Sequence, residues 1–420
     1  MNSPKKLVGL SVVVTINLAL QFLFQWYIIV SFGAGPLTDA YFGAMVIPQF
    51  ILLVLGGSLT LVLIPILSQY SGNMFLKESW NYFQFTAILF SGIAVLLFFT
   101  ARWWVHFLFP AFKEEIYVLA FNMSRIQLVS MVASAMLSIV WAVHSAKENF
   151  LLIETSSIIA NVIAFLFFYF AIEYYGIYAA AWVSVVRVLL QLMFLVKILG
   201  PYQKPDFNSE SFKITWKKLR PLLAGNMYYK TDTIIDRHLS SIGVNGELTL
   251  FNLAQQIYAA GYSILSKVLV NTMVPQMAKA HAAGDENGYN RIFRKRLSVT
   301  LIITSIIFFL FIIFGKWGLT FIFSFKKFNV DYVYRLWWIM ILLGGYWVIG
   351  LAGAITSGAF YTKGNTVTPT RLGVVLFTIF IPIKVFCYYR YGITGLAIAI
   401  STYYLTSFSI QFFLLKKHLQ

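Results

Sequence analysis

The sequence predicts an all-α polytopic membrane protein, with about twelve transmembrane helices in two pseudo-symmetric six-helix bundles around a central cleft. Hydrophobic residues make up 59% of the 420 residues and charged residues only 11%, against about 25% charged residues in a typical soluble domain. Apolar runs of roughly 20 residues recur along the chain, and each is long enough to cross about 30 Å of hydrocarbon as a helix. Similar segments also recur in the two halves, which is typical of transporters built from related repeats.

The apolar runs define the individual membrane spans. The first run follows the basic pair Lys5 and Lys6, and it is too long to be the core of a signal peptide, so we expect it to be retained. The predicted spans are 7–30, 40–69, 80–100, 117–143, 151–171, 177–197, 221–239, 248–278, 297–315, 331–360, 366–387 and 394–415. An even number of spans places both termini on one side of the membrane.

The basic residues indicate which side that is. The connections on the side of the termini hold roughly three times as many lysines and arginines as the other connections, which predicts cytoplasmic termini. The same asymmetry explains much of the net charge of +17 without nucleic acid. The longest polar stretches, 198–220 and 279–296, are too short to hold a soluble catalytic domain.

No catalytic or metal-binding motif is found in the chain. It contains no Walker loop, no HExxH and no GxSxG, so we expect a transporter rather than an enzyme, without catalytic residues. The single cysteine, Cys387, cannot form an internal disulfide, and the five histidines lack metal-ligand spacing. We therefore expect no metal and no cofactor.

Internal repeats predict the domain organisation. "SAKEN" (145–149) resembles "YTKGN" (361–365), and "YYGIYAAA" (174–181) resembles "RYGITGLA" (390–397) at the same offset. The repeats divide the chain into two six-helix bundles, 1–205 and 206–420. Chance matches in apolar sequence are the alternative.

A few charged residues fall inside predicted spans. Arg125, Glu154 and Arg187 lie in spans 4, 5 and 6, and Lys230 and Arg237 lie in span 7. A charge at the helix centre costs roughly 2.5–3.5 kcal/mol, so we expect the four basic residues to line a wet cavity and bind substrate. The alternatives are a buried structural pair for Arg125 and Arg187, and a side chain reaching water for Arg237.

Span 7 carries two polar stripes. Asn226, Lys230 and Arg237 share one helical face, which predicts a polar surface along the span. Asp232 and Asp236 lie four residues apart and could hold a coupling ion, either a proton or sodium, between them.

Uncharged amides mark two further spans. Asn17, Gln21 and Gln25 recur every four residues in span 1, and Gln255 and Gln256 lie in span 8. These residues either line the cavity and bind substrate or form interhelical hydrogen bonds worth about 1–2 kcal/mol.

The balance of deep charges indicates the class of substrate. Basic residues predominate, which favours an anionic group such as phosphate over a cationic drug. A drug or cation antiporter would instead place acids deep in its helices, and a non-transporting scaffold would not need polar stripes.

Two stretches carry a family resemblance. "FGAGPLTDAYFGAMVIPQFI" (32–51), followed by "LVLIPILSQY" (61–70), resembles the lipid II flippases of the MurJ (MviN) family, and the resemblance continues over 253–297. It implies the fold of the multidrug/oligosaccharidyl-lipid/polysaccharide (MOP) exporter superfamily and a functional role for Asp39 in substrate binding. An acid there would also stabilise the start of span 2 as a helix cap or through the helix dipole.

The departures from this family are as informative as the matches. Lipid II flippases carry arginines where this chain has Leu18, Phe24, Leu52 and Gln256, and they have fourteen helices. Twelve helices are typical of Wzx-type flippases for O-antigen and other polysaccharide repeat units. We therefore expect a flippase that moves a polyprenyl-diphosphate-linked oligosaccharide to the outer leaflet by alternating access, with lipid II as the alternative substrate.

This function sets the expected location and partners. We expect a multi-pass protein of the bacterial inner membrane that acts as a monomer on its glycan lipid. Membrane lipids and the polysaccharide polymerase machinery are the further expected partners, and nucleic acid is not expected. An ion gradient or the membrane potential would supply the driving force.

Overall fold

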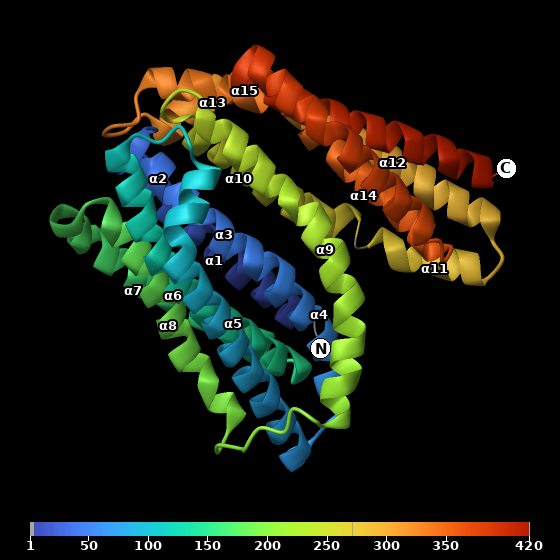
Figure 1. Ribbon diagram of the computed structural model, residues 1–420. Helices are drawn as coiled ribbons and strands as arrows, with labels where there is room; N and C mark the ends of the chain where they lie inside the picture. The colour runs from blue at the N-terminus through green and yellow to red at the C-terminus, as the bar shows by residue number, and fades with distance from the viewer. Residues whose placement is uncertain (1–3, 271, 420) are drawn as a thin grey trace. The chain divides into compact units, whose positions relative to one another are not determined.

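The computed structural model describes residues 4–270 and 272–419, and in this part of the chain the regular secondary structure is helical throughout (Figure 1). The chain divides into two compact units, Met1–Ile242 and Gly243–Gln420. The predicted all-α membrane fold is confirmed. The cleft between the two bundles stays a prediction.

The N-terminal unit contains nine α-helices and two short irregular helices. They are α1 (Pro4–Phe32), α2 (Pro36–Ala44), α3 (Val46–Ile51), the π-helix η1 (Leu52–Gly56), α4 (Gly57–Leu67), α5 (Gly72–Leu108), α6 (Glu114–Ala146), α7 (Phe150–Tyr175), α8 (Ile177–Leu195), the 3-10 helix η2 (Val196–Leu199) and α9 (Glu210–Ile242). The C-terminal unit contains α10 (Glu247–Leu269), α11 (Met273–Ala282), α12 (Glu286–Phe323), α13 (Val330–Leu342), α14 (Gly344–Thr362) and α15 (Val367–Leu419).

The number of spans follows from these helices. Ten segments of the described chain are long and apolar enough to cross a membrane. Helix α9 is not among them because it is too polar, and α15 consists of two helices that meet at Gly392, where φ is 60° and ψ is −147°. Counting α9 and both parts of α15 gives the twelve predicted spans.

The second span is interrupted where the sequence contains proline and glycine. Gly33 turns the chain after α1 with a φ of 76°, and Pro36 occupies the start of α2. The Thr38 hydroxyl accepts a hydrogen bond from the Gly35 backbone N–H at 3.0 Å, so Thr38 supports the start of the helix, and Asp39 is buried in its first turn. After Pro48, the backbone widens into η1, a π-helical turn of the kind that bends helices.

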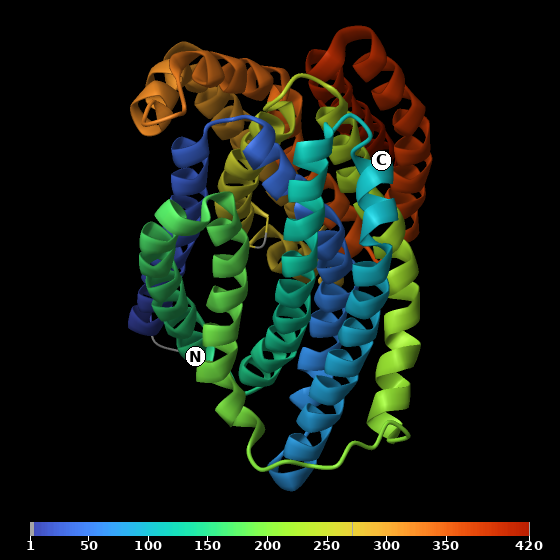
Figure 2. The ribbon, with the colours of Figure 1, turned by 60° about the vertical axis from the view of Figure 1, so that its left-hand side comes forward.

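Helix α9 belongs to the N-terminal unit. The Tyr82 hydroxyl of α5 lies 2.7 Å from both the Ser211 and Thr215 hydroxyls at the start of α9. Asp206, in the preceding connection, forms an ion pair with Lys77 of α5 at 3.1 Å, and this hydrogen bond holds the pKa of the Asp206 carboxyl below its usual value. Figure 2 shows the connection passing the start of α5 before it enters α9.

The boundary between the two compact units therefore falls after residue 242 of the chain. The predicted boundary between the two bundles falls after residue 205. The symmetric division into 1–205 and 206–420 concerns the repeat in the sequence and stays a prediction. The contacts of α9 with α5 show why this helix packs with the preceding helices in the structure.

The C-terminal unit contains a close approach between α14 and α15. A Cβ added at Gly345 would lie 2.7 Å from the Ser401 Cβ and 2.9 Å from the Ser401 carbonyl oxygen. Only glycine permits this spacing, as is common where membrane helices pack through small residues.

We predict that Gly345→Ala destabilises the protein by about 1–3 kcal/mol, because the new methyl group must push α15 away. The matched control is Gly353→Ala in the same helix, where a Cβ would meet no atom within 4 Å. Thermal unfolding in detergent measures both. An unchanged or raised midpoint for Gly345→Ala would contradict the close packing.

Candidate functional site

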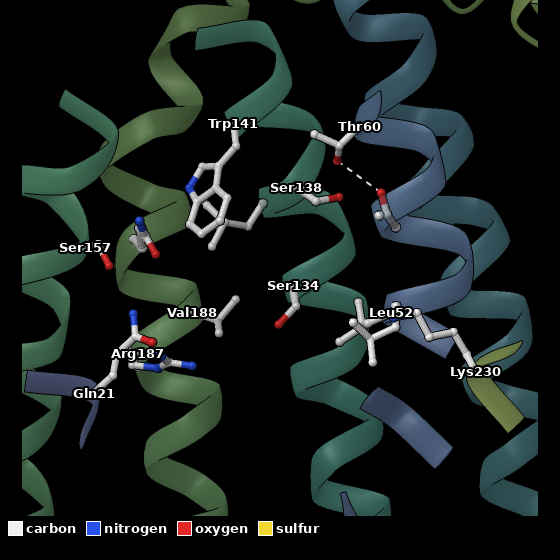
Figure 3. A pocket seen from close by; sticks show the side chains of 15 residues that line it. Gln21, Leu52, Thr60, Ser134, Ser138, Trp141, Ser157, Arg187, Val188 and Lys230 are labelled. Carbon is white, nitrogen blue, oxygen red and sulfur yellow. Dashed lines mark hydrogen bonds between the residues drawn. The ribbon is translucent and has the colours of Figure 1, made fainter. Parts of the chain in front are cut away.

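The N-terminal unit encloses a pocket of about 700 Å³ between its helices (Figure 3). Arg187 from α8 and Gln21 from α1 lie at one side of it, and Lys230 from α9 lies at the other side. The residues that line this main pocket are Gln21, Leu52, Leu53, Gly56, Gly57, Thr60, Ser134, Leu137, Ser138, Trp141, Ser157, Arg187, Val188, Gln191 and Lys230.

Both basic residues of the main pocket lack an acidic partner. Arg187 donates from Nη1 to the Asn161 Oδ1 at 3.4 Å, and the structure records no carboxylate within ion-pair distance of it among the described residues. Lys230 is half-buried, and within the same part of the chain it forms no ion pair either. The main pocket therefore presents two positive charges that no protein carboxylate pairs with directly.

An amide network holds Arg187 in place. Asn17 in α1 donates from Nδ2 to the Glu154 carboxylate at 2.8 Å. Its Oδ1 accepts from the Ser157 hydroxyl at 2.9 Å and from Asn161 Nδ2 at 2.7 Å. Asn161 then accepts from Arg187, so the network joins α1, α7 and α8 and links an acid to a guanidinium through two amides.

Glu154 faces a smaller pocket of about 260 Å³, which we call the Glu154 pocket. Its lining residues are Val14, Asn17, Thr60, Trp141, Ser145, Phe150, Ile153, Glu154 and Ser157. Three of them, Thr60, Trp141 and Ser157, also line the main pocket, so the two pockets are neighbours.

The structure brings only some of the predicted site residues to these pockets. Lys230, Arg187 and Gln21 line the main pocket, and Asn17 lines the Glu154 pocket. Gln25, one turn beyond Gln21, is half-buried but lines neither pocket.

Arg125 lies elsewhere in the unit. Its guanidinium carbon is 4.2 Å from the centre of the Phe98 ring and 4.1 Å from that of Phe121, and it borders an apolar groove formed by α5, α6 and α8. The expectation that Arg125 joins the other basic residues is therefore not met, because helical spacing alone does not tell which face of α6 meets the main pocket.

Further predicted residues of α9 and α2 are buried away from the main pocket. Arg237 and Asp236 are 9% and 4% exposed, Asp232 is half-buried one turn earlier, and Asp39 is 5% exposed at the start of α2. None of them lines the main pocket. The side chain of Asn226 lies outside the described residues.

The predicted amides of span 8 belong to the C-terminal unit. Gln256 donates from Nε2 to the Asn252 Oδ1 at 3.3 Å within α10, and Gln255 is half-buried beside it. Their substrate-binding role stays a prediction.

The sequence reasoning missed several polar lining residues. Ser134 and Ser138 line the main pocket one turn apart in α6, so helical spacing could have found this pair. Ser157 also lines the main pocket, and Asn161, one turn further along α7, belongs to the site through its hydrogen bonds to Asn17 and Arg187. Among the described residues, no group of three or more histidine, cysteine or acidic side chains could hold a metal ion.

Comparison with known proteins identifies the relatives of this chain. A family model described as "Lipid II flippase MurJ" matches residues 28–420. The "Probable lipid II flippase MurJ" of Buchnera aphidicola subsp. Baizongia pistaciae (strain Bp) is 26% identical, with 100% of this chain and 84% of the relative aligned. The "Lipid II flippase MurJ" of Burkholderia cenocepacia is 23% identical over 84% of this chain and 73% of its own length.

Solved structures share the fold. "Lipid II flippase MurJ, inward closed conformation" superposes with a TM-score of 0.84 at 18% identity, covering 97% of this chain and 87% of that one. An inward-facing multidrug resistance MATE family transporter of the MOP superfamily gives a TM-score of 0.77 at 14% identity, with 98% of each chain covered. These similarities confirm the predicted superfamily fold.

We predict that Asn17→Leu destabilises the protein by about 1–3 kcal/mol, because Glu154, Ser157 and Asn161 lose a shared hydrogen-bond partner. Gln25→Leu, in the same helix, is the control, since the structure records no hydrogen bond for Gln25 in the described residues. Unfolding midpoints in detergent compare the two. Equal midpoints would show that the network contributes nothing to stability.

Proposed function

Because the chain belongs to the MurJ lipid II flippase family, a family of membrane transporters for lipid-linked precursors rather than of enzymes, we propose that it moves lipid II from the inner to the outer leaflet of the bacterial inner membrane. The comparisons favour this substrate over the O-antigen or polysaccharide repeat unit. In both cases, the group to be carried through the membrane is a diphosphate that bears a glycan.

The observation that carries this proposal is the pair of basic residues without acidic partners in the main pocket. Placing a charge at the centre of a membrane helix costs roughly 2.5–3.5 kcal/mol, so Arg187 and Lys230 would only destabilise a protein in which they had no function. A diphosphate supplies the missing negative charge. The planar guanidinium of Arg187 can bind phosphate oxygens with two hydrogen bonds, while Lys230 acts as a point charge.

The position of Lys230 explains one departure from the family. Leu52 replaces an arginine that lipid II flippases carry, and Leu52 and Lys230 both line the main pocket (Figure 3). Helix α9 packs against η1 and thus supplies a positive charge to the pocket that η1 lines without one. This arrangement supports a cationic site assembled from different helices.

The pocket wall also contains the π-helical turn of the second span. Gly56 ends η1 and Gly57 begins α4, and both line the main pocket. The Thr60 hydroxyl donates to the Gly56 carbonyl oxygen at 3.0 Å, which satisfies a carbonyl near the π-helical turn (Figure 3). We propose that alternating access changes the bend of this helix around the bound diphosphate.

A repeat-unit flippase is the second candidate. It is favoured by the four positions where the arginines of lipid II flippases are absent, Leu18, Phe24, Leu52 and Gln256. The polysaccharide polymerase machinery would be a partner only in this case. Reconstituted protein presented with both lipids distinguishes the candidates by which one it transports.

The proposed transport cycle also needs a driving force, which a coupling ion could supply. Asp232 and Asp236 lie one turn apart on α9, the helix that also supplies Lys230. A proton or sodium ion bound by these acids could reset the transporter. The membrane potential, worth about 2.3 kcal/mol per charge per 100 mV, could act instead on the charged lipid.

We predict that the double variant Arg187→Gln, Lys230→Gln flips lipid II in proteoliposomes at least about tenfold more slowly than the wild type, because each lost charged hydrogen bond is worth about 1.5–3 kcal/mol. Arg125→Gln is the control, since Arg125 lies outside the main pocket. Wild-type flipping by a folded double variant would overturn the proposed site.

We predict that Asp236→Asn makes flipping independent of an imposed proton or sodium gradient, because the variant cannot bind the coupling ion. The measurement compares flipping with and without the gradient in the variant and the wild type. A wild-type rate that does not change when the gradient is collapsed would remove the acids from the coupling role and leave the membrane potential as the driving force.

A further inference from the structure

The Glu154 pocket differs chemically from the main pocket that it adjoins. The main pocket contains two basic side chains, whereas the Glu154 pocket contains a carboxylate and an amide. A carboxylate repels a diphosphate, so the two pockets do not suit the same chemical group. They suit neighbouring parts of a single ligand, one anionic and the other rich in hydrogen-bond donors.

Glu154 is oriented but has hydrogen-bonding capacity to spare. Asn17 Nδ2 donates to its Oε2 at 2.8 Å, and the described residues provide no basic group within ion-pair distance. An ionised carboxylate can accept about four hydrogen bonds, so most of its acceptor sites are available to a ligand. Hydroxyl groups are donors of the right kind.

Trp141 provides an apolar surface at the boundary of the two pockets. It lines both of them, and 38% of its surface is exposed. A broad aromatic ring beside one oriented acid and one oriented amide is typical of sites in which an apolar surface gives area and a few polar groups give specificity. A sugar ring fits this combination, because it has C–H faces and a rim of hydroxyls.

We propose that the Glu154 pocket binds the sugar attached directly to the diphosphate of the transported lipid. Glu154 accepts hydrogen bonds from the sugar hydroxyls, and Trp141 packs against the face of the ring. Arg187 and Lys230 hold the diphosphate in the adjoining main pocket, so the order of the two pockets follows the order of the groups along the ligand. This inference rests on the proposed function and adds a basis for recognising the glycan.

The experiment compares two lipids that differ only in the sugar. Binding of polyprenyl diphosphate and of its monoglycosylated form is measured by native mass spectrometry in detergent. Wild-type protein is expected to prefer the glycosylated lipid by at least about tenfold, because one hydrogen bond to a charged group is worth about 1.5–3 kcal/mol. Glu154→Gln and Trp141→Leu are each expected to lower the affinity for the glycosylated lipid more than the affinity for the bare lipid, and so to remove this preference.

Two controls separate the possible outcomes. Glu173→Gln changes an exposed acid of the same helix, α7, and is expected to keep the preference. Arg187→Gln is expected to weaken both lipids equally. Unfolding midpoints identify any variant that fails to fold, and the two variants at separate positions test the site independently.

Several results would overturn the inference. It fails if the Glu154 and Trp141 variants weaken both lipids equally, or if they keep the wild-type preference. Equal weakening together with an altered pH dependence of binding would instead make Glu154 a proton site that acts through Asn17 and Asn161 on Arg187. If the wild type binds neither lipid, the proposed function itself is wrong, and the sugar site fails with it.

Discussion

The N-terminal unit depends on one constraint. It holds positive charge inside a membrane-spanning unit without a directly paired acid. Arg187 and Lys230 face a pocket of about 700 Å³, and the described residues give neither an ion pair. Such charges stay in place only if hydrogen bonds orient them and if water or a ligand solvates them. The amide network satisfies the first condition for Arg187, because Asn161 accepts its hydrogen bond and Asn17 orients Asn161. The proposed anionic substrate would satisfy the second condition.

The surrounding helices follow from the same requirement. Helix α9 is too polar to be identified as a span by composition, and its contacts with α5 hold it against the N-terminal unit, where its Lys230 reaches the main pocket. The second span bends through η1 and brings Gly56 and Gly57 to the pocket wall. Small residues in α6, among them Ser134 and Ser138, leave space for the pocket. These helices thus place polar and basic side chains around a pocket inside the N-terminal unit.

The sequence was sufficient for the fold, and only partly for the site. Hydropathy located most of the spans because burial in lipid imposes long apolar runs, although α9 is too polar to stand out in this way. Charge inside the predicted spans selected Arg187 and Lys230, which line the main pocket. It also selected Arg125, which instead lies between two phenylalanine rings, because the sequence does not tell which face of α6 meets the pocket. Asn161 and Ser157 were missed because single uncharged polar residues are common in membrane helices. The contacts of α9 with α5, which depend on side chains distant in sequence, place α9 in the N-terminal compact unit, and the division of the sequence repeat at 205 stays a prediction.

The central claim is that the main pocket binds a diphosphate, and the lipid that stays bound during purification tests it most directly. Native mass spectrometry of the wild-type protein should detect a polyprenyl-diphosphate-linked glycan in about one copy per chain, and the mass of the glycan distinguishes lipid II from a polysaccharide repeat unit. The Arg187→Gln, Lys230→Gln variant should carry only bulk phospholipid. Retention of the same glycan lipid by that variant, or wild-type protein that carries only bulk phospholipid, would contradict the account.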